Sequence, residues 1–207
     1  MKVVGITGRS GSGKSTLAKA MGKLGAEVLD GDLIAAGLLE QGSPVLADVR
    51  DAFGPSYFRE DGALDRKKLG QRVFSDDRAL ATLNLIVHPH FQRLVERMIE
   101  DLRNRDNGPE IAVLDAAVLF EAGLDRVCDI IVVVICDDAS MAERIAARDG
   151  INEQMAQDRI EAQKSRMSDF SLTHMADMVV ISRGDQAEMD AWALRIARIA
   201  KGGTDEP

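Results

Sequence analysis

The chain has 207 residues, of which 45% are hydrophobic and 29% are charged, and its formal net charge is −8 at pH 7. This length and apolar content suit one globular domain and exclude a disordered chain, and the negative charge argues against a nucleic-acid-binding surface. No apolar run approaches the roughly 20 residues of a membrane span, and we expect no signal peptide, because the first apolar run leads straight into a glycine-rich loop.

That first run, Lys2–Thr7, is a predicted strand, and the next eight residues, GRSGSGKS, match the P-loop pattern G-x-x-x-x-G-K-[ST]. A helical pattern over Ser15–Leu24 completes the strand, turn and helix that the motif needs. In such a loop, backbone N–H groups and the helix N-terminus surround a polyphosphate, the lysine reaches its β- and γ-phosphates, and the serine hydroxyl holds Mg²⁺. The residues expected to bind ATP are Gly8, Gly11, Ser12, Gly13, Lys14, Ser15 and Thr16.

Beyond the P-loop, short apolar runs alternate with helical patterns. Further strands are predicted at Glu27–Leu29, Ile111–Leu114, Ile130–Ile135 and Met178–Ile181. Further helices are predicted at Leu33–Glu40, Val45–Phe53, Arg66–Phe74, Arg78–Asn104, Ser140–Arg148, Glu153–Arg166 and Ala187–Ala200, and Pro89 is expected to kink or break the longest of them. This alternation predicts an α/β protein with the three-layer fold of P-loop NTPases, built on a central parallel sheet of about five strands.

The stretch between the second and third predicted strands is longer than a crossover needs and almost wholly helical. We interpret it as an inserted helical lobe that closes over a substrate. The chain then forms one P-loop kinase domain, residues 1–207, with a core at about 1–40, 109–138 and 170–200, a helical substrate lobe at about 41–108 and a helical lid at about 139–169.

Acidic residues follow two of the predicted strands, where ligands of α/β sheets bind. Asp32 is the candidate for the base that accepts the proton of an attacking hydroxyl, although Asp is also a common helix N-cap. Asp30 is a base partner, a ligand of a Mg²⁺-bound water or a plain loop residue. Asp115 ends a Walker-B-type strand and is expected near Mg²⁺, and Glu121 is a weaker candidate at the same mouth.

Two arginines, Arg144 and Arg148, lie four residues apart on one predicted helix face, just before the helix stop at Asp149-Gly150. The next predicted helix carries Arg159, Gln163, Lys164 and Arg166. An arginine-rich pair of helices suits a lid that brings positive charge over the phosphates and expels water, although acidic neighbours also fit a solvated face. His88 has a substrate or a packing role, and His88 and His90 do not share a helix face as metal ligands would.

The two cysteines, Cys128 and Cys136, have neither metal-binding nor redox spacing and are expected to be reduced thiols of the core. We therefore expect a cytoplasmic protein that acts on a small molecule, without a nucleic-acid or membrane partner, as a monomer or weak homo-oligomer.

Taken together, these segments resemble the dephospho-coenzyme A kinase family over roughly residues 2 to 184. The resemblance includes the P-loop, Asp30-Gly31-Asp32, the LNLIVHP segment ending at Pro89, Leu119-Phe120-Glu121, Arg144 to Gly150, Arg159-Ile160 with Gln163, and Ala176 to Val180. The P-loop alone is shared by very many proteins, whereas the His-Pro, Arg-Asp-Gly and Ala-Asp segments in this order are more specific.

The resemblance implies MgATP-dependent phosphorylation of the ribose 3′-hydroxyl of dephospho-coenzyme A, the final step of coenzyme A biosynthesis. By the same resemblance Asp32 is the base, Arg144 or Arg148 contacts phosphates from the lid, the helical lobe binds the pantetheine-bearing substrate, and Ser182-Arg183-Gly184 lies near the adenine of ATP.

The chain departs from the family pattern at Gly31, Ala36, Ala117 and Ser182-Arg183. The family has a basic residue where Ala36 stands, so another group is expected to hold substrate phosphate or ribose. The candidates are Arg9, Lys67, Lys68 and Arg72.

Three alternatives remain open at this point. Adenylyl-sulfate, gluconate and shikimate kinases share parts of the Asp-x-Asp pattern but lack the His-Pro and Arg-Asp-Gly segments. A GTP-binding switch needs an Asn-Lys-x-Asp segment, which this sequence does not contain. A nucleotide-binding homologue without turnover is disfavoured by the presence of Lys14, Ser15 and Asp32.

Overall fold

The computed structural model describes residues 1–166 and 168–203. Its centre is a sheet of five parallel strands in the order β2-β3-β1-β4-β5. The strands are β1 (Lys2–Thr7), β2 (Glu27–Asp30), β3 (Ile111–Asp115), β4 (Ile130–Ile135) and β5 (Met178–Ile181). All five predicted strands are present, and the three-layer α/β fold predicted from the sequence is confirmed.

The helices of the described chain flank this sheet or project from it. They are α1 (Lys14–Lys23), α2 (Gly31–Gly37), α3 (Val45–Phe53), α4 (Arg66–Phe74), α5 (Asp77–Arg103), α6 (Asp138–Asp149), α7 (Glu153–Arg166), α8 (Asp169–His174) and α9 (Gln186–Ala200). Short 3₁₀ turns lie at Pro55–Tyr57 and Leu124–Val127. None of the helices in the described ranges is long and apolar enough to cross a membrane.

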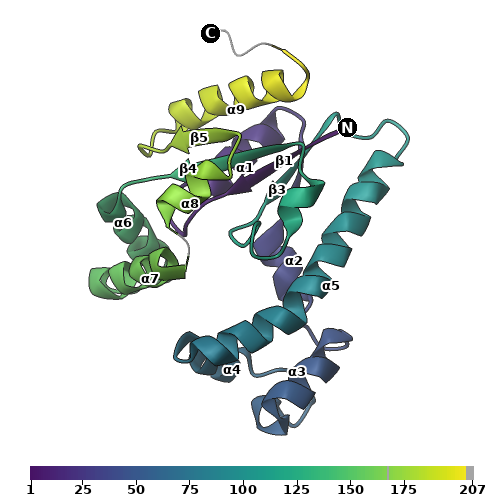
Figure 1. Ribbon diagram of the computed structural model, residues 1–207, viewed down its shortest axis with the longest axis vertical. Coiled ribbons are helices and arrows are strands. Elements are labelled where there is room, and N and C mark those ends of the chain that lie inside the picture. The colour runs from purple at the N-terminus through teal and green to yellow at the C-terminus, as the bar shows by residue number, and fades with distance from the viewer. Residues whose placement is uncertain (167, 204–207) are drawn as a thin grey trace.

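Two helix layers bury the two faces of the sheet, as Figure 1 shows. Alternate side chains of the strands point to opposite faces, so Val4 and Ile6 pack with α1 and α9 while Val3 packs on the other side. The second face is covered by the C-terminal half of α5, through Phe91, Val95 and neighbouring apolar residues. Burial of these apolar side chains on both faces is the main source of the sheet's stability.

The long helix α5 therefore packs in two separate places. This differs from the expected lobe of about residues 41–108, which includes the whole helix. Its N-terminal half packs with α3 and α4 around Val45, Val49 and Leu69, which form a separate apolar cluster. Its C-terminal half is the crossover that leads back to β3. Pro89 kinks the helix rather than breaking it: α5 continues through this residue, and its axis bends part-way along (Figure 1).

The hairpin of α6 and α7 has an apolar cluster of its own, formed by Met141, Ala142, Ile145, Ala156 and Ile160. In Figure 1 this hairpin and the α3–α4 lobe both project from the side of the sheet opposite α9. The molecule thus consists of one large core and two smaller, separately packed projections that border the same region.

Candidate active site

The P-loop connects β1 to α1 and has the conformation that phosphate binding requires. Gly13 has a φ of 102° and is the N-cap of α1, and a Cβ built on it would lie 2.8 Å from the Ser182 hydroxyl oxygen. A side chain would be strained there by both the backbone angle and the close neighbour. The loop therefore brings its N–H groups and the N-terminus of α1, which begins at Lys14, to one point.

Lys14, Ser15 and Asp115 meet beneath this loop. Lys14 Nζ lies 3.7 Å from Asp115 Oδ1, and both side chains are buried. Asp115 Oδ1 accepts no hydrogen bond from a described residue. Burial raises the pKa of Asp115, while the Lys14 charge and the Ser15 hydroxyl act in the opposite direction and the charges of Asp32 and Asp30 add to the rise. A buried carboxylate oxygen that lacks a donor is suited to a cation or to a water molecule bound to one.

The two acids after β2 have different roles in the fold. Asp30 is the N-cap of α2, because its carboxylate accepts a hydrogen bond of 3.0 Å from the backbone N–H of Leu33. The capping role considered for Asp32 thus belongs to Asp30, and α2 begins two residues earlier than predicted. Asp32 lies in the first turn, exposed, and no described residue donates a hydrogen bond to its carboxylate.

Gly31 determines how closely these acids approach β3. A Cβ built on Gly31 would lie 2.8 Å from the carbonyl oxygen of Asp115 and 2.9 Å from Ala116 Cβ. The missing side chain lets the N-terminus of α2 pack directly on the end of β3. Asp32 is therefore close enough to Asp115 for its charge to raise the pKa of that buried carboxyl group.

Arg148, near the end of α6, contacts the P-loop from the α6–α7 hairpin. Its guanidinium donates a hydrogen bond of 3.1 Å to the Ser10 hydroxyl in the P-loop. Asp149 holds it with two hydrogen bonds, from Nε at 2.7 Å and from an Nη at 3.2 Å, and also pairs with Arg159 of α7. The Asp149 bonds and charge, followed by the charge of Asp32, raise the pKa of Arg148. Arg148 thus contacts the P-loop and also responds to the charge of Asp32.

Arg144, one turn earlier on α6, reaches a different part of the P-loop. It donates a hydrogen bond of 3.0 Å to the carbonyl oxygen of Gly11 and another of 3.4 Å to the Ser182 hydroxyl. It also lies against Gly184 in the loop after β5, where an added Cβ would be 2.9 Å from an Arg144 nitrogen. This arginine joins the P-loop to the segment that the family resemblance places near adenine.

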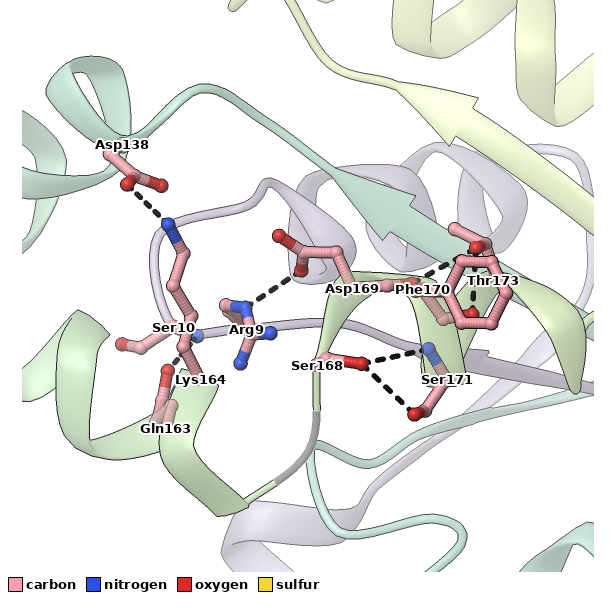
Figure 2. A network of polar contacts seen from close by, with 10 residues as sticks. All are labelled: Arg9, Ser10, Asp138, Gln163, Lys164, Ser168, Asp169, Phe170, Ser171 and Thr173. Atoms are coloured by element: carbon pink, nitrogen blue, oxygen red, sulfur yellow. Dashed lines mark hydrogen bonds and ion pairs between the residues drawn. The ribbon is translucent and has the colours of Figure 1, made fainter.

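Gln163 of α7 and Asp169 of α8 contact the first half of the P-loop, as Figure 2 shows. Arg9 Nε donates a hydrogen bond of 2.8 Å to Asp169 Oδ1 at the start of α8. The backbone N–H of Ser10 donates one of 3.2 Å to the side-chain oxygen of Gln163 on α7.

A cavity of about 120 Å³ lies beside these contacts. The sequence candidates His88 and Glu121 meet at its edge, where His88 Nδ1 is 3.0 Å from the carbonyl oxygen of Glu121. His90 turns away and faces Asp48. The cavity is lined by Gly8, Arg9, Ala117, Val118, Glu121, Gln163 and Leu172. A larger cavity of about 290 Å³ lies at the opposite end of the sheet, between the ends of α1 and α9, and is remote from every group described above.

The basic residues considered as replacements at position 36 are spread apart in the structure. Arg9 is paired with Asp169, Arg72 pairs with Asp76 at 2.7 Å, and Lys68 Nζ donates a hydrogen bond to the carbonyl oxygen of Ser56. Lys67 is exposed. The residue that does reach Ala36 is Arg66, which donates a hydrogen bond of 2.6 Å to its carbonyl oxygen.

Three participants in this arrangement were missed by the sequence reasoning. The sequence reasoning assigns Asp149 to a helix stop and to a solvated acidic face, and it singles out neither Asp169 nor Arg66. The proximity of Asp149 to Arg148 and its spacing from Arg159 were readable as a possible ion-pair network. The pairing of Asp169 with Arg9 had no sequence signal, because 160 positions separate the two residues.

Comparisons with known proteins agree with this geometry. A family model described as dephospho-CoA kinase matches residues 2–188. A dephospho-CoA kinase of Thermobifida fusca is 38% identical to the chain and covers 96% of it and 94% of the relative. A dephospho-CoA kinase of Campylobacter jejuni has the same fold with a TM-score of 0.65 at 23% identity, covering 98% of this chain and 99% of that one. A shikimate kinase of Acinetobacter baumannii shares the fold with a TM-score of 0.56 at 11% identity, covering 98% and 94%.

A family model that spans almost the whole chain, together with a relative of this identity and coverage, separates dephospho-CoA kinases from the other small-molecule kinases considered. The P-loop is a feature that this family shares with other ATP-dependent kinases. The chain belongs to the dephospho-CoA kinase family, which phosphorylates dephospho-CoA with ATP in the synthesis of coenzyme A.

Proposed function

We propose that Asp32 is the general base of this reaction and that it receives the proton of the ribose 3′-hydroxyl. The new bond forms between that oxygen and the γ-phosphorus of ATP, the bond to the β–γ bridging oxygen breaks, and ADP leaves. The supporting observation is a difference between the two acids. Asp30 caps α2, whereas the carboxylate of Asp32 accepts no hydrogen bond from the described residues. Asp32 is also near enough to Asp115 and Arg148, beside the P-loop, for its charge to raise the pKa of both groups.

The P-loop is proposed to hold the triphosphate through its backbone N–H groups and the charge of Lys14. Gly8, Gly11 and Gly13 allow the loop to curl, and Ser12, Ser15 and Thr16 complete the segment that leads into α1. Phosphoryl transfer of this kind depends mainly on positioning and on stabilising charge on the phosphate oxygens. A preformed cradle therefore contributes to the rate as well as to binding.

The residues present fit a magnesium ion. Ser15 and Asp115 lie together, the Asp115 carboxylate has an oxygen without a donor, and no larger group of His, Cys, Asp and Glu gathers elsewhere in the described ranges as a metal site. Mg²⁺ usually keeps several waters and takes few protein ligands beside substrate phosphates. When bound, it neutralises charge that develops on the β- and γ-phosphates.

Arg148 is proposed to stabilise the transferred phosphoryl group from the lid side, and Arg144 to fix the P-loop against the loop after β5. The Arg148 guanidinium already points at Ser10 and lies close to Asp32. Arg144 is tied to the P-loop backbone and to Ser182. The two arginines therefore have separate tasks.

The acceptor is proposed to lie between the acidic residues Asp32 and Asp115 and the cavity of about 120 Å³. His88 and Glu121 are proposed to contact it there. We take the α3–α4 lobe, about residues 41–88, and the α6–α7 hairpin, about residues 139–169, as the two parts that close over it. Such a reaction needs only small molecules, and we propose that it takes place in the cytoplasm.

The direct test is ADP release by the purified protein with MgATP and one acceptor at a time. Dephospho-CoA is expected to support turnover, whereas adenylyl sulfate, gluconate, shikimate and nucleoside monophosphates are expected to match the acceptor-free control. Release with one of those acceptors and none with dephospho-CoA would contradict the assignment. Lys14→Ala is the matched inactive control, since it removes the phosphate-binding charge.

A further inference from the structure

The first half of the P-loop is held by side chains from the lid side of the molecule. Arg9 contacts Asp169 of α8, and Ser10 contacts Gln163 of α7 and Arg148 of α6. Gly11 contacts Arg144. Three consecutive loop residues are thus attached to three different helices of one connected segment.

The contact between Arg9 and Asp169 differs from the others in its burial. The Arg9 side chain is only 5% exposed, while that of Asp169 is 48% exposed. A guanidinium that has lost this much water needs charged or hydrogen-bonded partners, and removal of one partner is more costly than the same loss at a surface. Figure 2 shows the two side chains pointing toward each other from the P-loop and from α8.

Arg9 of this pair also borders the cavity proposed to receive part of the acceptor. Gly8 and Arg9 form its P-loop wall, and Val118 and Glu121 form the wall after β3. The remaining wall comes from Gln163 of α7 and Leu172 of α8. Because Gln163 and Leu172 supply that wall, the cavity is complete only while α7 and α8 stay against the P-loop.

We propose that Arg9 and Asp169 are a positioning pair that holds the start of α8 on the P-loop and thereby completes the acceptor site. The inference rests on the proposed function, since it takes the cavity to be part of the acceptor site. The pair acts through placement of the wall and does not touch the reacting atoms. Its loss therefore weakens acceptor binding before it affects phosphoryl transfer or ATP binding.

The expected kinetic signature is a change confined to one substrate. The residues proposed to bind ATP, Gly8 and Gly11 to Thr16, do not take part in the Arg9–Asp169 contact, which joins two other side chains. Asp169→Asn is therefore expected to raise the KM for dephospho-CoA by about 10-fold, with the KM for ATP changed by less than about 2-fold. At saturating acceptor, kcat is expected to stay within about 3-fold of the wild type.

Asp138→Asn is the matched control. Asp138 forms an ion pair with Lys164 that joins α6 to α7, as Figure 2 shows. The same chemical change at this position is expected to leave the KM for dephospho-CoA within about 2-fold of the wild type. Asp169→Glu keeps the charge and is expected to recover most of the affinity.

A double-mutant cycle then tests whether the two residues act as a unit. Arg9→Met alone is expected to raise the acceptor KM as Asp169→Asn does, and the double variant is expected to add little to either single change. Additive effects, an unchanged acceptor KM in Asp169→Asn, or equal increases for ATP and acceptor would each overturn the proposal. Wild-type turnover with dephospho-CoA is measured alongside, so failure of the pair is distinguishable from failure of the proposed function.

Discussion

At the scale of single residues, the same change from Asp to Asn, made at Asp30 and at Asp32 in turn, separates folding from catalysis. Asn caps helices about as well as Asp, so Asp30→Asn is expected to keep α2 and most of the activity. Asp32→Asn removes the proposed base and is expected to reduce kcat by about 10²–10⁴-fold. Steady-state kinetics of both variants, with ATP binding measured separately, checks these two predictions.

The two outcomes have different meanings. ATP affinity is expected to be unchanged in Asp32→Asn, because the P-loop is intact. Near-normal turnover in that variant would remove Asp32 from the role of base. A large loss of turnover in a folded Asp30→Asn protein would show that the first acid does more than cap the helix.

Asp115 gives a second prediction at this scale, on stability and pH. Burial raises the pKa of Asp115 in the folded state above that of an ordinary aspartate, despite the nearby Lys14. A carboxyl group with a raised folded pKa favours folding most below its unfolded pKa, and this contribution is lost as pH rises through the folded value. At pH 7 the charged form therefore destabilises the ligand-free protein.

Asp115→Asn is expected to relieve this cost while weakening the proposed magnesium site. The Tm of the ligand-free protein at pH 7 should stay equal or rise, by about 2–4 °C for each kcal/mol gained, and the gain should vanish near pH 4. Turnover should fall by about 10²-fold or more. A thermal scan at both pH values, together with kinetics, checks this; a Tm that falls at pH 7 would contradict it.

At the scale of secondary structure, the lid arginine depends on its neighbour. Asp149 accepts two hydrogen bonds from Arg148 and pairs with Arg159 of the facing helix. Asp149→Asn keeps the size of the side chain but weakens both charge-assisted contacts, so Arg148 is less firmly positioned. We expect kcat to fall by about 10-fold, less than the roughly 10²-fold or larger loss for Arg148→Met.

The kinetic comparison includes a control on the same hairpin. Asp158→Asn changes an exposed α7 carboxylate that accepts a hydrogen bond from Gln154 of the same helix, and it should leave kcat within about 2-fold. Equal losses in Asp158→Asn and Asp149→Asn would show a general effect of charge on the lid instead of positioning of Arg148.

The secondary structure also shows how far the sequence could predict the fold. The parallel strands were readable because they are short apolar runs buried on both faces, and α3, α4 and α7 have the predicted bounds. The start of α2 was misplaced because two neighbouring acids could both cap it. The six-residue α8 was not predicted because so short a helix shows little periodicity.

At the scale of the whole molecule, the candidate site was only partly predictable. The P-loop, Asp32 and Asp115 could be grouped from the sequence because parallel strands bring their carboxyl ends to one edge. The contacts of Arg9 with Asp169 and of His88 with Glu121 depend on how α5 and the lid return to the sheet. No local pattern encodes these long-range pairings, and the division of α5 between lobe and sheet was missed for the same reason.

The separate packing of the two projections leads to the last prediction, which concerns their closure over the acceptor. The α3–α4 lobe and the α6–α7 hairpin each have an apolar cluster separate from the sheet core, so each can shift as a unit without exposing that core. Hydrogen exchange is expected to slow in the P-loop with MgATP alone. The further addition of dephospho-CoA is expected to slow it in both projections, while β1, β3 and β4 remain equally protected throughout.

A nonreactive ATP analogue keeps the ternary complex intact during that measurement, and Asp32→Asn serves as an independent catalytically impaired form. Both projections border the proposed acceptor site, so the acceptor gains contacts only when they approach each other and water is excluded. Protection that is identical with and without dephospho-CoA would show that the described arrangement is already closed. Protection of the lobe alone would assign acceptor binding to α3–α5 and leave the lid to ATP, because the two clusters would then respond to different substrates.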